Sequence, residues 1–397
     1  MKQAETLLRK SISDLDAAVK GTMNLEDQAR FESAGFQARV ALAQTYLLDC
    51  VKRPADVIEV LKDVDERYGS DEDKTSAAWS LRISAMEKQG KLDEAIALLD
   101  SLIKKSPESR AIGRAAGQIA RAIDRRSEEF DKAGKTKERD EQQKRAAVYY
   151  SMSGRALAKS TTTQARDIEE IANRLFALGL QFNQVPKEWD SFVGWQKAAG
   201  NDLTLWKEAE NLYRAALQLA PSYLNMIKLG RSLGFQGQYQ EAAAEYGRLF
   251  DSEALIDPTT NPPKFNAALR KQKPELYLAY LEWGVAAAET AAQSRDAEMY
   301  LRAGTIFDNI VRTPDPSGPT ARIFWHAKLH QIRNFYSQGK YADASLLLRD
   351  IERTNSELGA PAGLQGDFTK LKESLKSKGS SSSNNSPPPP PKPEPPK

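Results

Sequence analysis

The chain has a single cysteine, Cys50, and only two histidines, His326 and His330, among its 397 residues. One cysteine excludes an intramolecular disulfide and a four-cysteine zinc site. Two histidines leave little with which to build a Ser-His-Asp or Cys-His catalytic set. No nucleophile, acid, base or metal-ligand set converges in the sequence, so we expect neither enzymatic activity nor a cofactor. Cys50 follows the apolar run 46–48, and we expect it to be a small buried residue near a helix end.

An excess of one charge and a long apolar run are also lacking. The 57 basic and 54 acidic residues give a formal net charge of +3, so strong attraction to nucleic acid or to an anionic membrane is not expected. The most apolar window, residues 276–292, contains Glu282 and Glu289 and indicates a buried soluble helix. Residues 1–16 carry charges where a secretory signal would be apolar. These features predict a cytoplasmic protein that contacts no membrane.

What the sequence does contain is helical periodicity. Apolar residues recur at intervals of three and four, Gly and Pro fall mostly between the periodic stretches, and strand signals are nearly absent. Each such helix buries one apolar stripe, so successive helices are expected to pack antiparallel through short turns.

Three segments, 76–107, 222–251 and 320–356, share one spacing. A glycine ends the first helix of each segment. An alanine follows five residues after that glycine, and larger apolar residues follow nine and twelve residues after it. Glycine supplies the backbone freedom of a tight turn, and the small alanine allows two helices to cross closely. The residues that define the repeats are Trp79, Gly90, Ala95 and Pro107 in the first, Leu229, Gly230, Gly237, Ala242 and Tyr246 in the second, and Gly339 and Ala344 in the third.

This order of Leu-Gly, aromatic, alanine and large residue resembles the tetratricopeptide repeat (TPR) family. The resemblance implies an all-α, right-handed α-solenoid of about seven antiparallel helix pairs over residues 1–377. A fragment from Ala209 to Pro221 matches a second helix alone. Less regular pairs are expected at 27–48 with 54–67, 108–133 with 137–158, and 273–292 with 296–312. A helix within residues 1–20 is expected to cap one end, and a helix at 364–377 the other.

The composition changes at Lys378. Residues 378–397 hold Ser and Asn followed by Pro, and none of them can build a core, so we expect a disordered tail. Pro387, Pro390 and Lys392 form a P-x-x-P-x-K arrangement that a polyproline-reading domain could bind. Five consecutive prolines satisfy that pattern almost by accident, and a flexible extension is the alternative.

Five basic side chains are candidates for a binding groove. Counting back from the two later repeat glycines places them on the inner side of first helices, the side that lines the concave surface in TPR proteins. The resemblance therefore implies a groove for an acidic or C-terminal segment of a partner, although the asparagines that usually accompany such a clamp are missing. Ordinary surface charge is the alternative. The five are Lys228, Arg231, His326, His330 and Arg333.

The two histidines lie four residues apart on one expected helix, so they share a face. No third ligand accompanies them, and a stable zinc site normally needs three or four. We therefore expect no metal there.

Three of the six tryptophans fall in one window: Trp189, Trp195 and Trp206. Pro186 and Gly200 delimit the first part of it, and we expect an extra short helix between them. Its aromatic residues either anchor a partner or fill an irregular joint between helices, which is the more common role.

These features together predict a non-enzymatic adaptor that holds a partner peptide or helix in a concave groove. One alternative is a structural subunit of a larger assembly, using its convex face or end caps. A second is a helical-repeat RNA-binding protein, which the near balance of charge disfavours. The expected partner is a protein or peptide whose identity the sequence does not specify.

Overall fold

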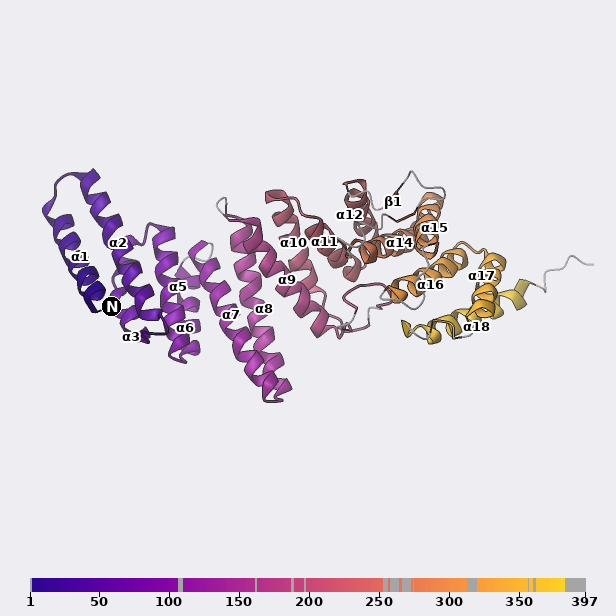
Figure 1. Ribbon diagram of the computed structural model, residues 1–397, viewed down its shortest axis with the longest axis horizontal. Helices are drawn as coiled ribbons and strands as arrows, with labels where there is room; N and C mark the ends of the chain where they lie inside the picture. Colours follow the sequence, from indigo (N-terminus) through magenta and orange to yellow (C-terminus); the bar gives the residue numbers. More distant parts are fainter. Residues whose placement is uncertain are drawn as a thin grey trace, which may run out of the picture. The chain divides into compact units, whose positions relative to one another are not determined.

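The computed structural model describes residues 2–105, 110–160, 163–186, 189–195, 198–252, 256–257, 264–265, 273, 275–312, 320–355, 357–359 and 362–382. Seventeen helices account for most of these residues, and helices that are neighbours in sequence pack in pairs (Figure 1). The one strand pairing among them joins β1 (Ile256–Asp257) antiparallel to β2 (Lys264–Phe265). Across this described part of the chain, every helix is too short or too polar to cross a membrane.

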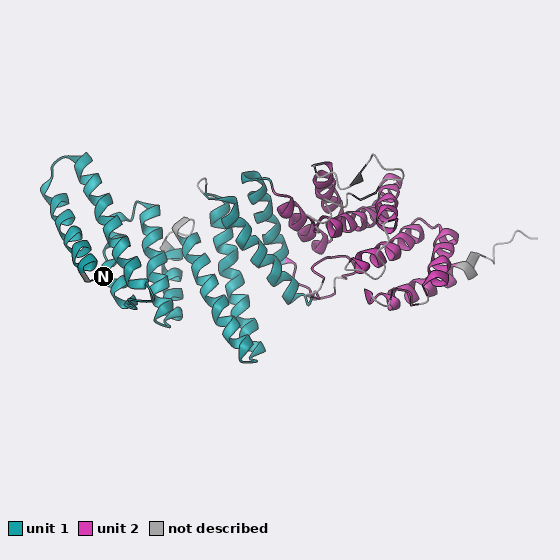
Figure 2. Ribbon diagram, viewed as in Figure 1, with its two compact units in different colours: residues 1–184, 204–221 teal, residues 185–203, 222–397 magenta. Residues whose placement is uncertain are grey.

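The chain forms two compact units (Figure 2). Unit 1 comprises residues 1–184 and 204–221, and unit 2 comprises residues 185–203 and 222–397. Residues 185–203 therefore belong to unit 2, although in sequence they lie between two helices of unit 1. The continuous array expected over residues 1–377 remains a prediction.

Unit 1 is built from successive helix pairs. Helix α2 packs on α5 and α5 packs on α7, so the first helices of successive pairs also contact one another. Its helices are α1 (Lys2–Gly21), α2 (Leu25–Leu47), α3 (Pro54–Val60), α4 (Val64–Tyr68), α5 (Glu72–Lys88), α6 (Leu92–Lys105), α7 (Arg110–Lys132), α8 (Thr136–Ala158), α9 (Ala165–Phe182) and α10 (Thr204–Leu219).

Unit 2 follows the same plan. Helix α11 packs on α14, and α14 packs on α16, and we call the surface of these three helices the first-helix face of unit 2. The helices of this unit are α11 (Tyr223–Gln236), α12 (Tyr239–Ser252), α14 (Glu275–Ser294), α15 (Ala297–Val311), α16 (Ala321–Ser337), α17 (Tyr341–Thr354) and α18 (Gln365–Ser382).

The three segments with the same residue spacing also have the same type of turn between their two helices. Gly90, Gly237 and Gly339 have φ values of +73°, +78° and +74°, the left-handed conformation that glycine adopts at a helix C-terminus. In each, the amide after the glycine donates to the carbonyl five residues earlier, which closes the last helical turn. These bonds run from Lys91 to Met86 at 2.8 Å, from Gln238 to Leu233 at 3.0 Å and from Lys340 to Phe335 at 3.0 Å.

The alanines of the repeats, Ala95, Ala242 and Ala344, are fully buried. The positions nine and twelve residues after each glycine are also buried, so the predicted apolar spacing is confirmed in all three repeats. Gly230 has a distinct role, because a Cβ there would lie 2.6 Å from Cζ of Tyr246. Trp79 and Leu229, which also define the repeats, are buried. Pro107 lies outside the described residues.

The α7–α8 pair uses the same turn with different packing. Gly134 has φ +70°, and the Lys135 amide donates to the Phe130 carbonyl at 2.9 Å. The close approach is made by glycines of the first helix. A Cβ on Gly113 would lie 2.4 Å from the Cβ of Ala156, so these helices meet almost backbone to backbone.

One predicted helix, at 54–67, is divided into α3 and α4. Arg82 of α5 is buried and donates to the Leu61 carbonyl, and its Nη1 donates to Oδ2 of Asp65 at 2.6 Å. A side chain that takes a carbonyl from the helical ladder interrupts the helix at that point.

Two further predictions need correction. Cys50 is exposed rather than buried, because α2 ends at Leu47 and Cys50 lies in the turn beyond it. The C-terminal helix continues past residue 377 to Ser382, because extending a helix anchored by buried Phe368 and Leu375 is far easier than starting one. Residues 383–397, with Pro387, Pro390 and Lys392, lie outside the described part.

The substitution Gly230→Ala tests the packing of α12 on α11. The added methyl group meets the ring of the fully buried Tyr246, and overpacking of this kind costs about 2 kcal/mol or more. Urea unfolding should show the loss. Gly366→Ala in α18 is the matched control, because its Cβ meets nothing within 4 Å, and alanine there should stabilise the chain slightly. Equal effects of the two substitutions would contradict this packing.

Candidate functional site

Within residues 185–203, the described residues 189–195 lie on the first-helix face of unit 2 as an irregular segment. We call them the docked segment. The extra helix predicted between Pro186 and Gly200 is wrong for the described residues, which instead form turns. The indole of Trp189 donates to the Val193 carbonyl at 2.7 Å, and Ser191 Oγ accepts from the Val193 amide at 3.2 Å. These side chains take backbone groups that a helix would need.

Phe192 anchors the docked segment on α11. Its ring fills a notch at Gly234, where a Cβ would lie 2.3 Å from the phenyl ring. It also meets Phe235 edge-on, with ring centroids 6.2 Å apart. Phe192 is 4% exposed, so the contact has the character of a protein core.

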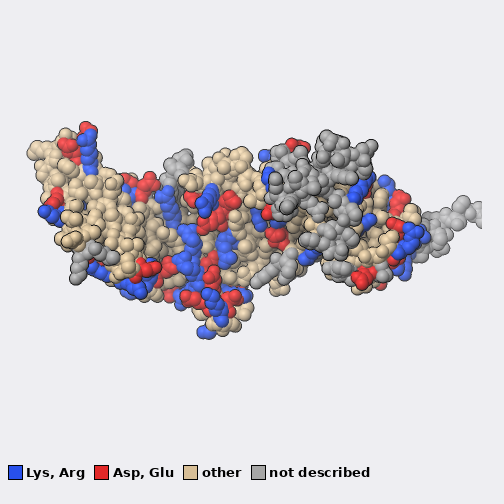
Figure 3. Space-filling model, in the orientation of Figure 1, with Lys and Arg blue, Asp and Glu red and all other residues tan. Residues whose placement is uncertain are grey.

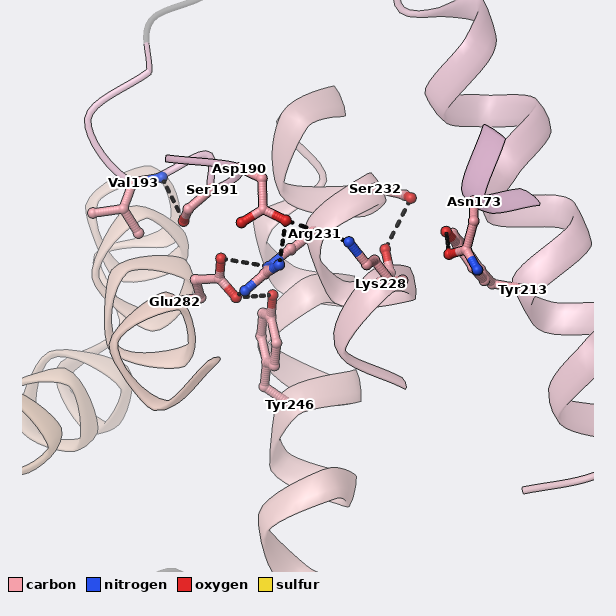
Figure 4. Close-up of polar contacts among 10 residues, drawn as sticks. All are labelled: Asn173, Asp190, Ser191, Val193, Tyr213, Lys228, Arg231, Ser232, Tyr246 and Glu282. Atoms are coloured by element: carbon pink, nitrogen blue, oxygen red, sulfur yellow. Dashed lines mark hydrogen bonds and ion pairs between the residues drawn. The ribbon is translucent and has the colours of Figure 1, made fainter. Parts of the chain in front are cut away.

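An ionic network joins the docked segment to two helices (Figure 4). Arg231 of α11 donates from Nε to the Glu282 carboxylate of α14 at 2.8 and 3.1 Å. Its Nη1 donates to Oδ2 of Asp190 at 2.9 Å, and Lys228 Nζ donates to the same oxygen at 3.3 Å. The side chain of Glu282 is fully buried, whereas that of Asp190 is 42% exposed. One guanidinium therefore bridges an interior carboxylate and a carboxylate at the rim.

The Glu282 carboxylate is further held by hydroxyl groups. Tyr246 of α12 donates to its Oε2 at 2.9 Å, and the Ser191 hydroxyl of the docked segment also lowers its pKa. Burial raises the pKa of Glu282, while the charge of Arg231 and the two hydroxyl groups oppose that rise. Burial disfavours the charged form of Arg231, but the carboxylates of Glu282 and Asp190 outweigh it, and the pKa of Arg231 is raised.

Trp189 connects the docked segment to α16. Its ring stacks on His326 at a centroid distance of 4.9 Å and an interplanar angle of 8°. The guanidinium of Arg322 lies 4.4 Å from the centre of the Trp189 ring, in a cation–π contact. Gly194 has φ +79°, and a Cβ there would lie 3.0 Å from Cε1 of His326. The segment thus packs closely around this histidine.

Both histidines are held neutral by their surroundings. His326 is 3% exposed and His330 is 5% exposed, and the two rings stack at 6.3 Å. Burial, with the charges of Arg322 and Arg333, lowers the pKa of His326 to about 3. Burial also lowers the pKa of His330 well below its usual value. Neither ring nitrogen of His326 has a hydrogen-bond partner within the described residues.

The structure buries three of the five predicted groove residues, Arg231, His326 and His330. Arg231 and His326 are covered by the docked segment, and His330 is buried against Phe307 of α15. Arg333 Nη2 pairs with Oδ1 of Asp367 on α18 at 3.1 Å. The expectation of an accessible basic groove is corrected for Arg231, His326 and His330, because the chain covers them with its own side chains; for Lys228 and Arg333, which are 29% and 34% exposed, it stays a prediction.

The tryptophan window is divided between the two units. Trp189 is buried and Trp195 is partly buried in unit 2, where the Trp195 ring lies 5.4 Å from that of Phe235. Trp206 is fully buried in unit 1, and a Cβ on Gly179 would lie 2.5 Å from its Nε1. These contacts favour the joint-filling role for the tryptophans over that of exposed anchors.

Sequence reasoning missed Asp190 and Glu282 as partners of the predicted cations. A signal was present, because Glu282 lies in the most apolar window of the chain. A carboxylate buried in such a helix requires a positive charge or hydrogen-bond donors nearby.

Unit 1 has an open cavity that sequence reasoning also missed. It has a volume of about 470 Å³ and is lined by residues of α5, α7, α8 and α9. Arg114 and Arg121, two helical turns apart on α7, contribute to its wall together with Gln118. Their side chains are 41% and 43% exposed, and their nearest carboxylates, on Asp73 and Glu170, lie 3.7 and 3.6 Å away. Both guanidinium groups remain accessible to a further acceptor.

No set of three His, Cys, Asp or Glu side chains is grouped as metal ligands within the residues that the structure describes. Comparison with models of protein families finds no match for this chain, and comparison with curated proteins finds none either.

The buried histidine predicts a dependence of stability on pH. Below about pH 6.5 the unfolded imidazole of His326 takes up a proton, while the folded one, with a pKa of about 3, stays neutral. The free energy of unfolding should therefore fall as the pH is lowered from 7 to 5, by about 2 kcal/mol for this group. His326→Phe keeps an aromatic ring beside Trp189 and should remove that part of the fall in urea titrations. The same pH dependence in both proteins would contradict a neutral buried His326.

Proposed function

We propose that the chain is a non-enzymatic adaptor, built as a TPR-like right-handed solenoid, that holds a segment of a partner protein on its first helices. The observation that carries the proposal is the docked segment itself. Two first helices of unit 2, α11 and α16, hold an irregular stretch of chain through side-chain contacts. The same mode of recognition, applied to a segment of another protein, is peptide binding by a helical repeat.

The cavity of unit 1 is the proposed site for the partner. The matching face of unit 2 is already covered, whereas this cavity is open and has two accessible guanidinium groups. An arginine fork binds a carboxylate in a bidentate manner, so the preferred partner is an acidic segment or a C-terminal carboxylate. Helices α7 and α8 carry basic and acidic side chains side by side on the surface seen in Figure 3. This mixture favours a protein partner over nucleic acid, whose binding needs a basic excess.

A second candidate function is that of a structural subunit. Met23 and Leu25, at the tip of the α1–α2 pair, are 102% and 81% exposed. Large apolar side chains exposed together at a tip are candidates for burial against another protein. This favours an end-to-end contact in a larger assembly.

The adaptor proposal is tested with Arg114→Glu plus Arg121→Glu. A partner would first be recovered by affinity purification and mass spectrometry, then purified, and its binding measured by calorimetry. Reversing both charges should weaken binding about a hundredfold, because each charge-assisted contact contributes roughly 1.5 kcal/mol. Arg126→Glu is the matched control. It lies on the same helix, is 42% exposed and stands 3.8 Å from its carboxylate, but it does not line the cavity.

The subunit proposal is tested with Met23→Lys plus Leu25→Lys. Light scattering on a size-exclusion column should show the unmodified chain as an assembly and the double variant as a smaller species, because two charged groups oppose burial of the tip. A monomeric unmodified chain at all accessible concentrations would count against self-assembly through this tip.

A further inference from the structure

We propose that the first-helix face of unit 2 is a second peptide-reading site, that the docked segment occupies it as an internal ligand, and that a partner segment with the same side-chain order displaces it. The order is tryptophan, an acidic residue, one further residue and a second aromatic residue. This inference rests on the proposed adaptor function, and it concerns a different surface from the unit 1 cavity.

Each element of that order has its own receptor on the face. Trp189 lies between the His326 ring and the Arg322 guanidinium of α16. Asp190, the next residue, accepts from Arg231 and Lys228 of α11. A partner lacking the carboxylate would leave these two cations without that acceptor.

The second aromatic residue of the order binds in a notch on α11. Phe192 occupies the space that a side chain at Gly234 would fill, and it also approaches Tyr239 at the start of α12, with ring centroids 6.2 Å apart. Ser191, between the acidic and aromatic positions, is buried and accepts from the Val193 amide. Trp189, Asp190 and Phe192 therefore contact two first helices, α16 and α11, which explains how a short motif is specific.

The face stays electrostatically balanced when the segment leaves. The most deeply buried charges, Arg231 and Glu282, lie on α11 and α14, and the Tyr246 hydroxyl that also holds Glu282 comes from α12. None of the three belongs to the docked segment. Release of Asp190, whose side chain is 42% exposed, therefore leaves the buried Arg231–Glu282 pair intact, and breaking that pair would be the costly outcome. Exchange of ligands is thus compatible with a folded unit 2.

The docked segment competes with the partner for the same face, so it lowers the apparent affinity of the chain for the partner. The segment is covalently joined to its receptor helix α11 through residues 196–222, and a tethered ligand acts at an effective concentration that reaches the millimolar range. The apparent affinity of a competing peptide falls in proportion to the fraction of molecules in which the face is free. Weakening the internal ligand should therefore strengthen binding of the same sequence added as a separate peptide.

The experiment uses a fluorescein-labelled peptide with the sequence of residues 185–195 as the probe, with the full chain as receptor and fluorescence anisotropy as the readout. Trp189→Ala plus Phe192→Ala in the chain removes two internal anchors and leaves the face unchanged. The probe should bind this variant at least about tenfold more tightly than the unmodified chain. A peptide with lysine at the position of Asp190 should lose that binding. Adding Gly234→Ala to the variant should abolish it, because the new methyl group fills the phenyl notch.

Two outcomes overturn the inference. One is equal binding of the probe to the unmodified and double-variant chains, which shows that the segment does not occlude the site. The other is no binding to a variant that circular dichroism and thermal unfolding show to be folded. If the double variant is unfolded, Asp190→Ala replaces it, since it removes only a half-exposed rim contact, and the same two outcomes apply. Persistent dependence of partner binding on Arg114 and Arg121 would leave the adaptor proposal intact even then.

Discussion

The arrangement of unit 2 depends on the pairing of Arg231 with Glu282. Two opposite charges in a protein interior are tolerated only when each satisfies the other with good geometry, and here the guanidinium Nε donates to both carboxylate oxygens. The pair fixes α11 against α14, and the Tyr246 hydroxyl adds α12 to the same carboxylate. The remaining guanidinium face is directed at Asp190. One ion pair therefore sets the register of three helices and provides the position at which the docked segment is held.

The helical framework could be predicted from the sequence because its determinants are local. The repeat glycines adopt the left-handed turns that their spacing indicated, and the alanines five residues later are buried. Helix α9 is not predicted from the sequence, because its residues do not match the spacing that the three repeats share. Ile168, Ile171 and Leu175 nevertheless follow a helical period and are buried. The break between α3 and α4 was not predictable locally, because its cause is Arg82, on another helix.

The sequence predicts the candidate sites only in part, because the residues that form them are far apart in the sequence. The shared spacing correctly placed Arg231, His326 and His330 on first helices, and two of them, Arg231 and His326, contact the docked segment. It could not reveal that they are covered, because their partners Asp190 and Trp189 lie far away in sequence and in an irregular stretch. The turn-rich docked segment was taken for a helix because proline and glycine at its limits are also helix boundary signals. The accessible guanidinium groups of the unit 1 cavity depend on the packing of four helices, which no single stretch encodes.

The order of the docked segment in the chain has a consequence for biosynthesis. Trp189 leaves the ribosome well before His326, on which it stacks, and more than 130 residues separate the two. At translation rates of roughly 5–20 residues per second, the Trp189 side chain waits about 7 to 27 seconds for its receptor. Until α16 is synthesised, the nascent chain exposes an apolar stretch to which a chaperone could bind. The docked segment can complete its contacts only after α16 has been synthesised.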